Sequence, residues 1–242
     1  MVVVPTIFST EAQVKELLGR LEVHYLANED PHIYFALLAD FPDADSEQIA
    51  GDQLLLDSAG NGIEELNRRY STDESLRFFL FHRRRVWNES EGRWMGWERK
   101  RGKLDEFNRL LRGATDTSFV VRHGDVSVLP SVKYVITLDS DTQLPMDCAR
   151  RLVGTLSHPL NRPRFDARRQ HVTEGYGVCQ PRVGVSIESA NKTPFALIFS
   201  GHVGIDPYTT AVSDVYQDLF HEGSYVGKGI YDVDAFEASL SG

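Results

Sequence analysis

The 242-residue sequence lacks the features that mark several large classes of protein. Its two cysteines, Cys148 and Cys179, are too few for a disulfide framework and indicate reduced thiols. Its longest apolar run, residues 33–39, is much shorter than the ~20 residues of a membrane-spanning helix. The first residues lack the basic region and long apolar stretch of a signal peptide. These absences exclude a disulfide-rich peptide and give no sign of a membrane anchor within the sequence.

Positive charge is also scarce. The chain has 26 Lys and Arg against 35 Asp and Glu, which gives a net charge of −9. Such a balance disfavours binding of the whole surface to nucleic acid or to anionic lipid. It permits a cationic ligand, or an anion that is held through a metal. We therefore expect no nucleic-acid partner, although basic residues interleaved with tryptophans leave RNA binding as a competing hypothesis.

Short apolar runs alternate with amphipathic stretches from the first residue to about residue 156. This alternation predicts an α/β domain whose sheet is mostly parallel, with helices on both faces. Strands are expected at residues 1–8, 33–39, 78–81, 119–122, 132–138 and 177–185. Helices are expected after Thr10, over 45–70 with a weak point at Gly60-Asn61-Gly62, over 103–112, and from Pro145. Residues 83–103 and 157–176 are expected to be loops.

In a sheet of this kind, ligands bind beyond the carboxyl ends of the strands. Three stretches fall at such ends, namely residues 6–9, 40–43 and 139–142. Thr6 and Asp40 are therefore candidate nucleotide-binding residues. Two of the three stretches are rich in aspartate, and this is the main indication of function. For Asp40 by itself, a simple turn with Pro42 is the alternative interpretation.

Asp139 and Asp141 follow the most strand-like segment of the chain. Residues i and i+2 of an extended chain point to the same side, so both carboxylates can face one cation. Oxygen ligands of this kind suit Mg²⁺ or Mn²⁺, with phosphate oxygens completing the shell. The alternative is a turn that caps the helix expected at Pro145. A phosphatase with a similar motif would need Thr or Val where this chain has Gln143.

Gly102 and Lys103 stand at the start of an expected helix, where backbone N–H groups and the lysine can approach an anion. A solvated basic loop is the alternative. Trp94 and Trp97 can form a stacking surface for a sugar, but packing is the more common role of tryptophan. None of the eight histidines shows the spacing of zinc ligands.

Six motifs together resemble the glycosyltransferase family 84 module of cyclic β-1,2-glucan synthases, a GT-A type related to processive glycosyltransferases. In order, they are VVVPTIF, LLADFPDAD, WMGWERKRGKLDEFNRLL, VITLDSDTQLP, VCQPRV and FHEGSYVGKGIYDVDAF. The resemblance spans nearly the whole chain. It implies a single Rossmann-like GT-A domain over residues 1–242. It also implies a metal-dependent, inverting hexosyltransferase that moves glucose from UDP-glucose to a growing β-1,2-glucan acceptor.

The resemblance also implies roles for individual residues. Asp40 matches the acidic residue that contacts uracil, and Lys103 matches a lysine near the nucleotide. Asp139 and Asp141 match the DxD motif that holds Mn²⁺ or Mg²⁺ on the diphosphate. Gly223 and Ser224 resemble the segment beside the acceptor sugar, so they are expected in substrate binding.

In the processive relatives the catalytic base follows the glycine-serine segment at a distance that passes Gly242. We therefore expect a fragment truncated before the base, with Glu222 as a substitute candidate, that transfers glucose poorly or not at all. The resemblance implies a much larger parent protein with transmembrane helices at the cytoplasmic face of a bacterial inner membrane. The fragment itself is expected to be soluble. A non-catalytic UDP-sugar or glucan-binding domain with the same fold is the alternative.

Overall fold

The computed structural model describes residues 1–71, 75–166, 168, 171–181, 219, 225 and 227–240. The chain divides into two compact units. One consists of residues 1–179 together with 227–242, and the other of residues 180–226. The elements and the site below belong to the first unit.

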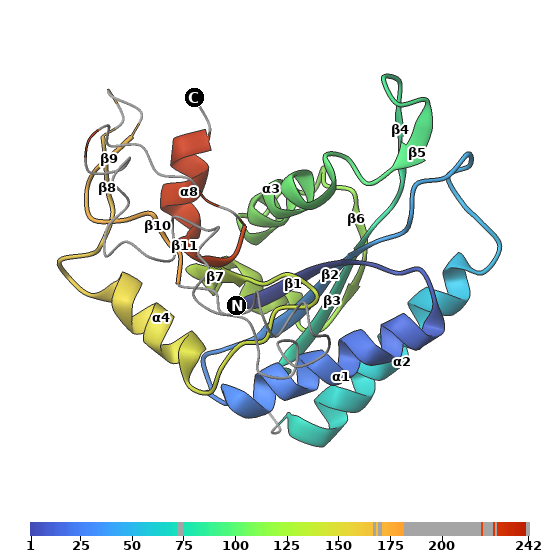
Figure 1. Ribbon diagram of the computed structural model, residues 1–242, viewed down its shortest axis with the longest axis horizontal. Helices are drawn as coiled ribbons and strands as arrows, with labels where there is room; N and C mark the ends of the chain where they lie inside the picture. Colours follow the sequence, from blue (N-terminus) through green and yellow to red (C-terminus); the bar gives the residue numbers. More distant parts are fainter. Residues whose placement is uncertain are drawn as a thin grey trace, which may run out of the picture. The chain divides into compact units, whose positions relative to one another are not determined.

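A seven-stranded sheet forms the centre of this unit, in the order β10-β11-β7-β1-β2-β3-β6 (Figure 1). Its strands are β1 (Val2–Ile7), β2 (Phe35–Asp40), β3 (Phe78–Arg83), β6 (Phe119–His123), β7 (Tyr134–Thr137), β10 (Val178–Cys179) and β11 (Gly229–Asp232). The four central strands, β7-β1-β2-β3, run parallel. The strands outside them pair antiparallel. The expected mostly parallel α/β sheet is confirmed, and it is consistent with a Rossmann-like GT-A fold.

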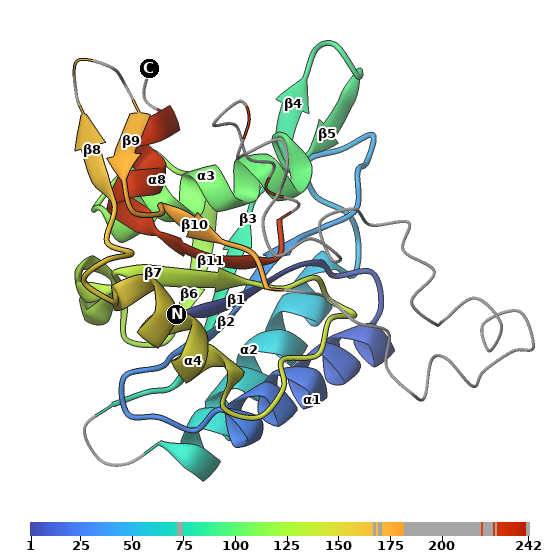
Figure 2. The same cartoon turned by 60° about the vertical axis from the view of Figure 1, so that its left-hand side comes forward.

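Helices cover both faces of the sheet (Figures 1 and 2). α1 (Glu11–Ala27), α2 (Asp52–Tyr70) and α4 (Cys148–Ser157) lie on one face, while α3 (Arg99–Leu111) and α8 (Val233–Leu240) lie on the other. The short 3₁₀ helix Val126–Ser131 precedes β7. Thr10 caps α1 as expected, because its side chain accepts a hydrogen bond from the backbone N–H of Gln13.

The alternation of side chains along each strand divides the core between the two faces. Phe78 and Leu80 of β3 join the cluster that α1, α2 and α4 cover. Phe81, which points the other way, packs against Phe107 of α3 and Phe119 of β6. Position 83 therefore lies on the α3 side of the sheet, and position 82 lies on the α1 and α2 side.

Some boundaries differ from those expected. α2 begins at Asp52 rather than at residue 45, after Gly51 with a φ of 101°. It then runs unbroken through Gly60 and Gly62. A β-carbon at Gly62 would lie 2.2 Å from Cδ1 of Leu18, so this glycine allows α1 and α2 to pack closely. The expected weak point is wrong because the glycines sit at packing contacts.

Two segments expected to be loops contain hairpins instead. β4 (Val86–Asn88) pairs with β5 (Arg93–Met95), and β8 (Arg164–Asp166) pairs with β9 (His171–Glu174). In the first hairpin the Asn88 side chain accepts the N–H of Ser90, and Gly92 takes a φ of 61° in the turn. Such short strands have too few residues for a clear two-residue period.

The other helix starts also shift. α3 begins four residues before the expected position 103, and α4 begins at Cys148 rather than at Pro145. Of the strand expected at 177–185, the structure describes β10, which ends at Cys179, and residues 180 and 181; the rest lies outside the described residues. Among the helices that the structure describes, none is both long and apolar enough to cross a membrane.

Candidate functional site

The predicted residues Thr6, Asp40 and Asp139 lie at the same edge of the sheet. Thr6 and Asp40 are near the carboxyl ends of β1 and β2, where Thr6 pairs with Ala39 and Ile7 with Asp40. Asp139 follows β7, which runs parallel to β1. The carboxyl ends of parallel strands meet at one edge, so the expected convergence of these three positions follows from the topology.

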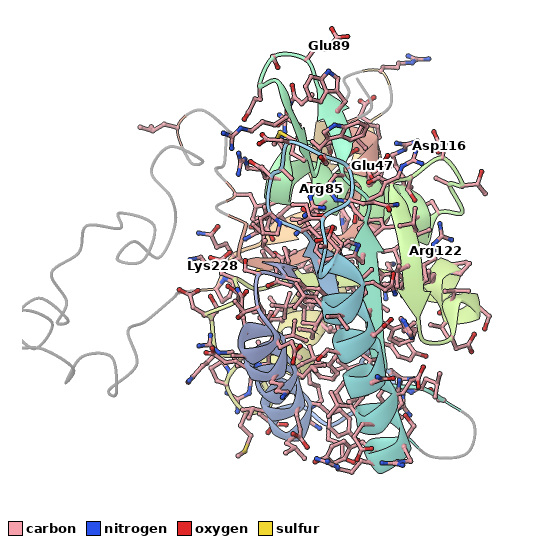
Figure 3. All side chains as sticks on the ribbon, turned by 90° about the vertical axis from the view of Figure 1, so that its right-hand side faces the viewer. Glu47, Arg85, Glu89, Asp116, Arg122 and Lys228 are labelled. Atoms are coloured by element: carbon pink, nitrogen blue, oxygen red, sulfur yellow. The ribbon has the colours of Figure 1, made fainter. Side chains whose placement is uncertain are left out.

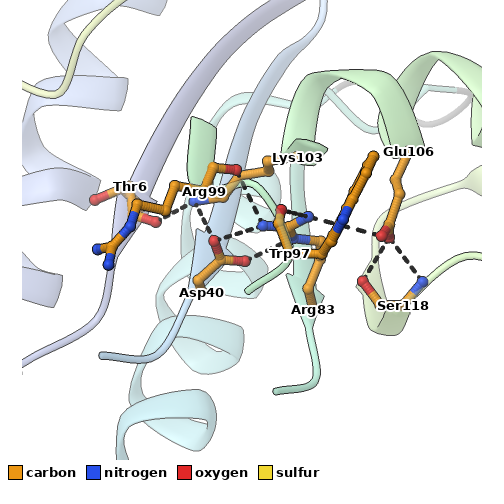
Figure 4. A network of polar contacts seen from close by, with 8 residues as sticks. All are labelled: Thr6, Asp40, Arg83, Trp97, Arg99, Lys103, Glu106 and Ser118. Carbon is orange, nitrogen blue, oxygen red and sulfur yellow. Dashed lines mark hydrogen bonds and ion pairs between the residues drawn. The ribbon is translucent and has the colours of Figure 1, made fainter. Parts of the chain in front are cut away.

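Asp40 is the centre of a buried polar network (Figure 4). Arg83 binds it with two parallel hydrogen bonds, from Nε to Oδ1 and from Nη2 to Oδ2, each 2.8 Å long. Nζ of Lys103 lies 3.0 Å from the same Oδ2. The carboxylate is thus compensated by two cations inside the protein. Oδ1 accepts one of these hydrogen bonds, and a carboxylate oxygen can accept two, although the Asp40 side chain is only 7% exposed.

Arg83 links this network to the start of α3. Its side chain is fully buried, and its Nη1 and Nη2 donate to the backbone carbonyls of Trp97 and Arg99 at 3.0 and 3.1 Å. Its Nη1 also lies 3.7 Å from Glu106, whose other oxygen accepts the backbone N–H of Ser118. Arg83 therefore ties the end of β2 to the first turn of α3.

The backbone at this turn is strained. Glu98 and Arg99 have φ values of 50° and 47°, in the left-handed region that non-glycine residues rarely adopt. Strain of this kind persists where the surroundings hold it, and here Arg83 and Gly102 do so. A β-carbon on Gly102 would lie 2.3 Å from the carbonyl oxygen of Trp97. The glycine before Lys103 thus serves close packing of the turn.

Lys103 reaches from α3 across the sheet edge. Its ammonium group donates to the carbonyl of Thr6 at 2.6 Å and pairs with Asp40. Burial lowers the pKa of Lys103 to about 8, although the negative charge of Asp40 opposes this shift. Since the side chain is buried, Lys103 fixes β1, β2 and α3 to one another.

Two further polar side chains lie buried on the other side of β1 and β3. Thr6 Oγ1 and both ring nitrogens of His82 have no hydrogen-bond partner. The His82 ring lies 4.2 Å from the ring of Phe41 between centroids, and burial lowers its pKa to about 4. Sequence reasoning missed His82; the signal was a histidine at an inward position of an otherwise apolar strand.

The loop after β2 is held in place by Arg85 (Figure 3). Its guanidinium donates to the carbonyls of Pro42 and Glu47 at 2.7 and 3.0 Å, and it pairs with Asp52 at 2.6 Å. Asp52 also accepts the N–H of Ile49. These contacts order the segment that follows Asp40 and place the start of α2.

Asp139 lies between two lysines. Lys100 of α3 donates to its Oδ1, and Lys228, just before β11, lies 2.9 Å from its Oδ2. Burial by itself would raise the pKa of Asp139, but hydrogen bonds from the two lysines outweigh it and the pKa is lowered. Asp141, two residues on, is exposed. The carboxylate of Asp139 is therefore ionised over the neutral range.

α1 supports the loop that carries both aspartates. Arg20 donates to the carbonyl of Ser140 at 2.6 Å. The Asn28 side chain accepts the N–H of Ala149 at 2.9 Å, at the start of α4. Nδ1 of the buried His24 accepts the N–H of Leu144 at 3.4 Å. The aspartate loop is thus held between two helices.

The backbone turns at Ser140 and Asp141 rather than continuing extended as expected, and the N–H of Thr142 donates to the carbonyl of Asp139 at 3.0 Å. The oxygen donors of this loop are still of the kind that a divalent cation prefers. Within the described part of the chain, His, Cys, Asp and Glu nowhere gather in a group of three or more that could hold a metal. Two carboxylates, one exposed and one about one-third exposed, suit a Mg²⁺ or Mn²⁺ ion whose remaining ligands are phosphate oxygens and water. The role of Asp139 and Asp141 as metal ligands stays a prediction.

The structure does not test the roles expected of the remaining site residues. Glu222, Gly223 and Ser224 lie outside the described residues. Trp94 packs edge-on against Trp87 across the β4–β5 hairpin, with ring centroids 5.9 Å apart, and Trp97 is 45% exposed. The structure thus leaves the stacking role of the tryptophans as a prediction.

The chain is similar to a glucan synthase. It is 53% identical over 241 residues, 99% of its length, to the cyclic beta-(1,2)-glucan synthase NdvB of Rhizobium meliloti (strain 1021). It spans 8% of the length of NdvB. No known family model matches the chain. The similarity to NdvB agrees with the resemblance to glucan synthases carried by the motifs.

Proposed function

We propose that the chain is the donor-binding core of a metal-dependent, inverting glucosyltransferase. In this role it binds UDP-glucose and supplies glucose to a growing β-1,2-glucan. The observation that carries the proposal is the 53% identity to a glucan synthase along nearly the whole chain. The placement of Thr6, Asp40 and Asp139 at one edge of a parallel sheet supports it, since nucleotides bind at such edges.

In this proposal each part of the site has a separate task. The end of β2, where Asp40 keeps one acceptor position on Oδ1, receives the N–H of the uracil ring. Lys103 and Arg83 hold that carboxylate in place. Asp139 and Asp141 hold the metal ion. The bound cation would stabilise the departing diphosphate as a Lewis acid.

The stereochemistry of glucose transfer determines which further groups the reaction requires. A β bond formed from an α-linked donor requires attack by the acceptor hydroxyl on the side opposite UDP. A carboxylate must then remove the proton of that hydroxyl. Glu222 is the substitute candidate for this role, and in the proposal Gly223 and Ser224 lie beside the acceptor sugar.

Titration calorimetry of UDP in the presence of Mn²⁺ tests the proposal. We expect the wild-type chain to bind UDP and Asp141→Ala to bind it at least about tenfold more weakly, because a charge-assisted metal contact is lost. Asp116→Ala, which removes an exposed carboxylate far from the aspartate loop in sequence, is the matched control. Absence of UDP binding by the wild type would contradict the proposal.

Transfer of radiolabelled glucose from UDP-glucose to a β-1,2-glucan would identify an enzyme core and exclude a non-catalytic binding domain. Binding of UDP without transfer agrees with the expectation that the chain transfers glucose poorly or not at all, and it also fits the non-catalytic alternative, in which the same site holds a UDP-sugar.

A further inference from the structure

The cluster of Asp139 and two lysines carries more positive than negative charge. Lys100 belongs to the first turn of α3, and Lys228 belongs to the segment before β11, yet one ammonium group lies on each oxygen of the same carboxylate. Lys100 also donates to the carbonyl of Gly227 at 2.9 Å. Gly227 has a φ of 78°, which brings its carbonyl to Lys100. Both lysines are thereby held at one place.

One ammonium group would neutralise Asp139, so the second leaves an excess of one positive charge. The side chains of Lys100, Asp139 and Lys228 are 34%, 32% and 30% exposed, so solvent and small anions can reach all three. Ion pairs with this much exposure add little stability. The arrangement is therefore a weak means of holding the fold together but a suitable one for exchanging ionic partners.

A divalent cation on Asp139 and Asp141 would alter this balance. Two carboxylates neutralise the cation, and the two lysines then remain as two uncompensated positive charges beside it. A nucleoside diphosphate brings a compensating negative charge of similar size. Lysine is a flexible point charge that suits phosphate oxygens.

We propose that Lys100 and Lys228 are ligands of the diphosphate of the nucleotide, and that they exchange Asp139 for phosphate oxygens when the nucleotide binds. This assignment rests on the proposed function for the metal and the nucleotide. It adds two anion-binding residues to the site, and it gives Asp139 two states, paired with lysine or bound to the cation.

The first test compares UDP and uridine by calorimetry in Mn²⁺-containing buffer. Lys100→Met and Lys228→Met should each weaken UDP binding by about tenfold or more, since each removes a charge-assisted hydrogen bond. Binding of uridine should change less than about twofold, because uridine carries no phosphate. Arg101→Met, which removes an exposed cation from the same turn of α3, is the control and should leave both affinities within about twofold of the wild type. Equal melting temperatures would show that the variants fold.

The second test uses inorganic pyrophosphate in metal-free buffer with chelator. Asp139→Asn should bind pyrophosphate more tightly than the wild type by about tenfold, because it releases both lysines from their carboxylate partner. The double variants Asp139→Asn with Lys100→Met, and with Lys228→Met, should lose this gain. A purely structural role for the lysines would give no such reversal.

The outcomes separate the two proposals. Wild-type UDP affinity in both lysine variants, or no gain of pyrophosphate binding in Asp139→Asn, would overturn the lysine assignment and leave the proposed function standing. A wild-type chain that binds no UDP with Mn²⁺ would overturn the proposed function and the lysine assignment together.

Discussion

Asp40 and Asp139 are both conventional candidates for nucleotide sites, yet they have different surroundings. Asp40 is buried and held by Arg83 and Lys103. Asp139 is partly exposed and held by lysines that solvent can reach. Breaking a buried charge network is costly because removing one member leaves another charge uncompensated. Exposed ion pairs contribute little stability, so their partners exchange readily. The Asp40 network therefore acts as the fixed part of the site, and the Asp139 cluster as its adaptable part.

Replacing Arg83 by Met should destabilise the chain by about 3–5 kcal/mol, because Asp40 is left buried with a single cation and two backbone carbonyls lose their donors. Urea unfolding at neutral pH measures the change. Arg101→Met, at a position 79% exposed, should shift the unfolding free energy by less than about 0.5 kcal/mol. A loss below about 1 kcal/mol in Arg83→Met would contradict the view that this network holds β2 to α3.

At the scale of elements, the start of α3 decides the form of the site. Two left-handed residues, Glu98 and Arg99, turn the chain so that Lys100 and Lys103 project from one helix to two aspartates. The buried Gly102 permits this turn to close. The strain is offset by the hydrogen bonds of Arg83 to the carbonyls of the turn.

Gly102→Ala and Gly19→Ala should have opposite effects, although both add one methyl group to a helix. At Gly102 the new β-carbon meets the Trp97 backbone, so we expect a loss of about 1–3 kcal/mol. Gly19 in α1 has no atom within 4 Å of that position, so Ala should raise stability by about 0.5–1 kcal/mol. Thermal unfolding of the two variants measures both effects. Stabilisation of the chain by Gly102→Ala would show that the turn is less tightly packed than the structure indicates.

The elements that could be predicted from the sequence were those with a strong local signal. The apolar runs of β1, β2 and β3 and the Thr10 cap of α1 appear where they were expected. The start of α3 was displaced by four residues because a distant arginine holds its first turn. No local pattern carries that information, since the period of a helix says nothing of a partner in another strand.

The candidate site likewise has some residues whose positions follow from local sequence patterns and others whose positions depend on distant contacts. The strand-end rule was enough to place Thr6, Asp40 and Asp139 at one edge. The lysines around Asp139 could not be predicted, because they come from positions 39 residues before it and well after it, joined only by the fold. The burial of Lys103 was also not foreseen; a glycine-lysine pair at a helix start indicates an anion site as readily as a buried ion pair.

At the scale of the whole molecule, the sheet joins segments that are distant in the chain. β11 pairs antiparallel with β7, so that Ile230 lies opposite Ile136. This pairing brings Lys228 to Asp139, and Tyr231 to Asn108 of α3, where its hydroxyl donates at 2.7 Å. The adaptable part of the site is thus complete only when both ends of the described unit have folded together.

Two buried histidines make the stability of this unit depend on pH. Burial lowers the pKa of His24 and of His82 from 6.5 to about 4. For His82 the carboxylates of Asp40 and Asp52 oppose the shift, and the cations of Lys103 and Arg85 add to it. Below pH 6.5 the unfolded chain therefore takes up protons that the folded chain refuses until about pH 4.

The contribution of each histidine is fully present above pH 6.5 and is lost as the pH falls toward 4. Linkage gives a loss of about 2 kcal/mol per histidine at pH 5. Urea unfolding of the wild type and of His82→Leu at pH 7.5 and pH 5 isolates one of them. The fall in unfolding free energy between the two pH values should be smaller by about 2 kcal/mol in the variant, since the other titrating groups are common to both.

His32→Gln, at an exposed position, is the control and should keep the wild-type difference. An equal fall in the wild type and in His82→Leu would mean that His82 gains a proton in the folded chain as readily as in the unfolded one. Such a result would place water or a charged partner beside its ring nitrogens, and the contact between His82 and Phe41 would then be open rather than packed.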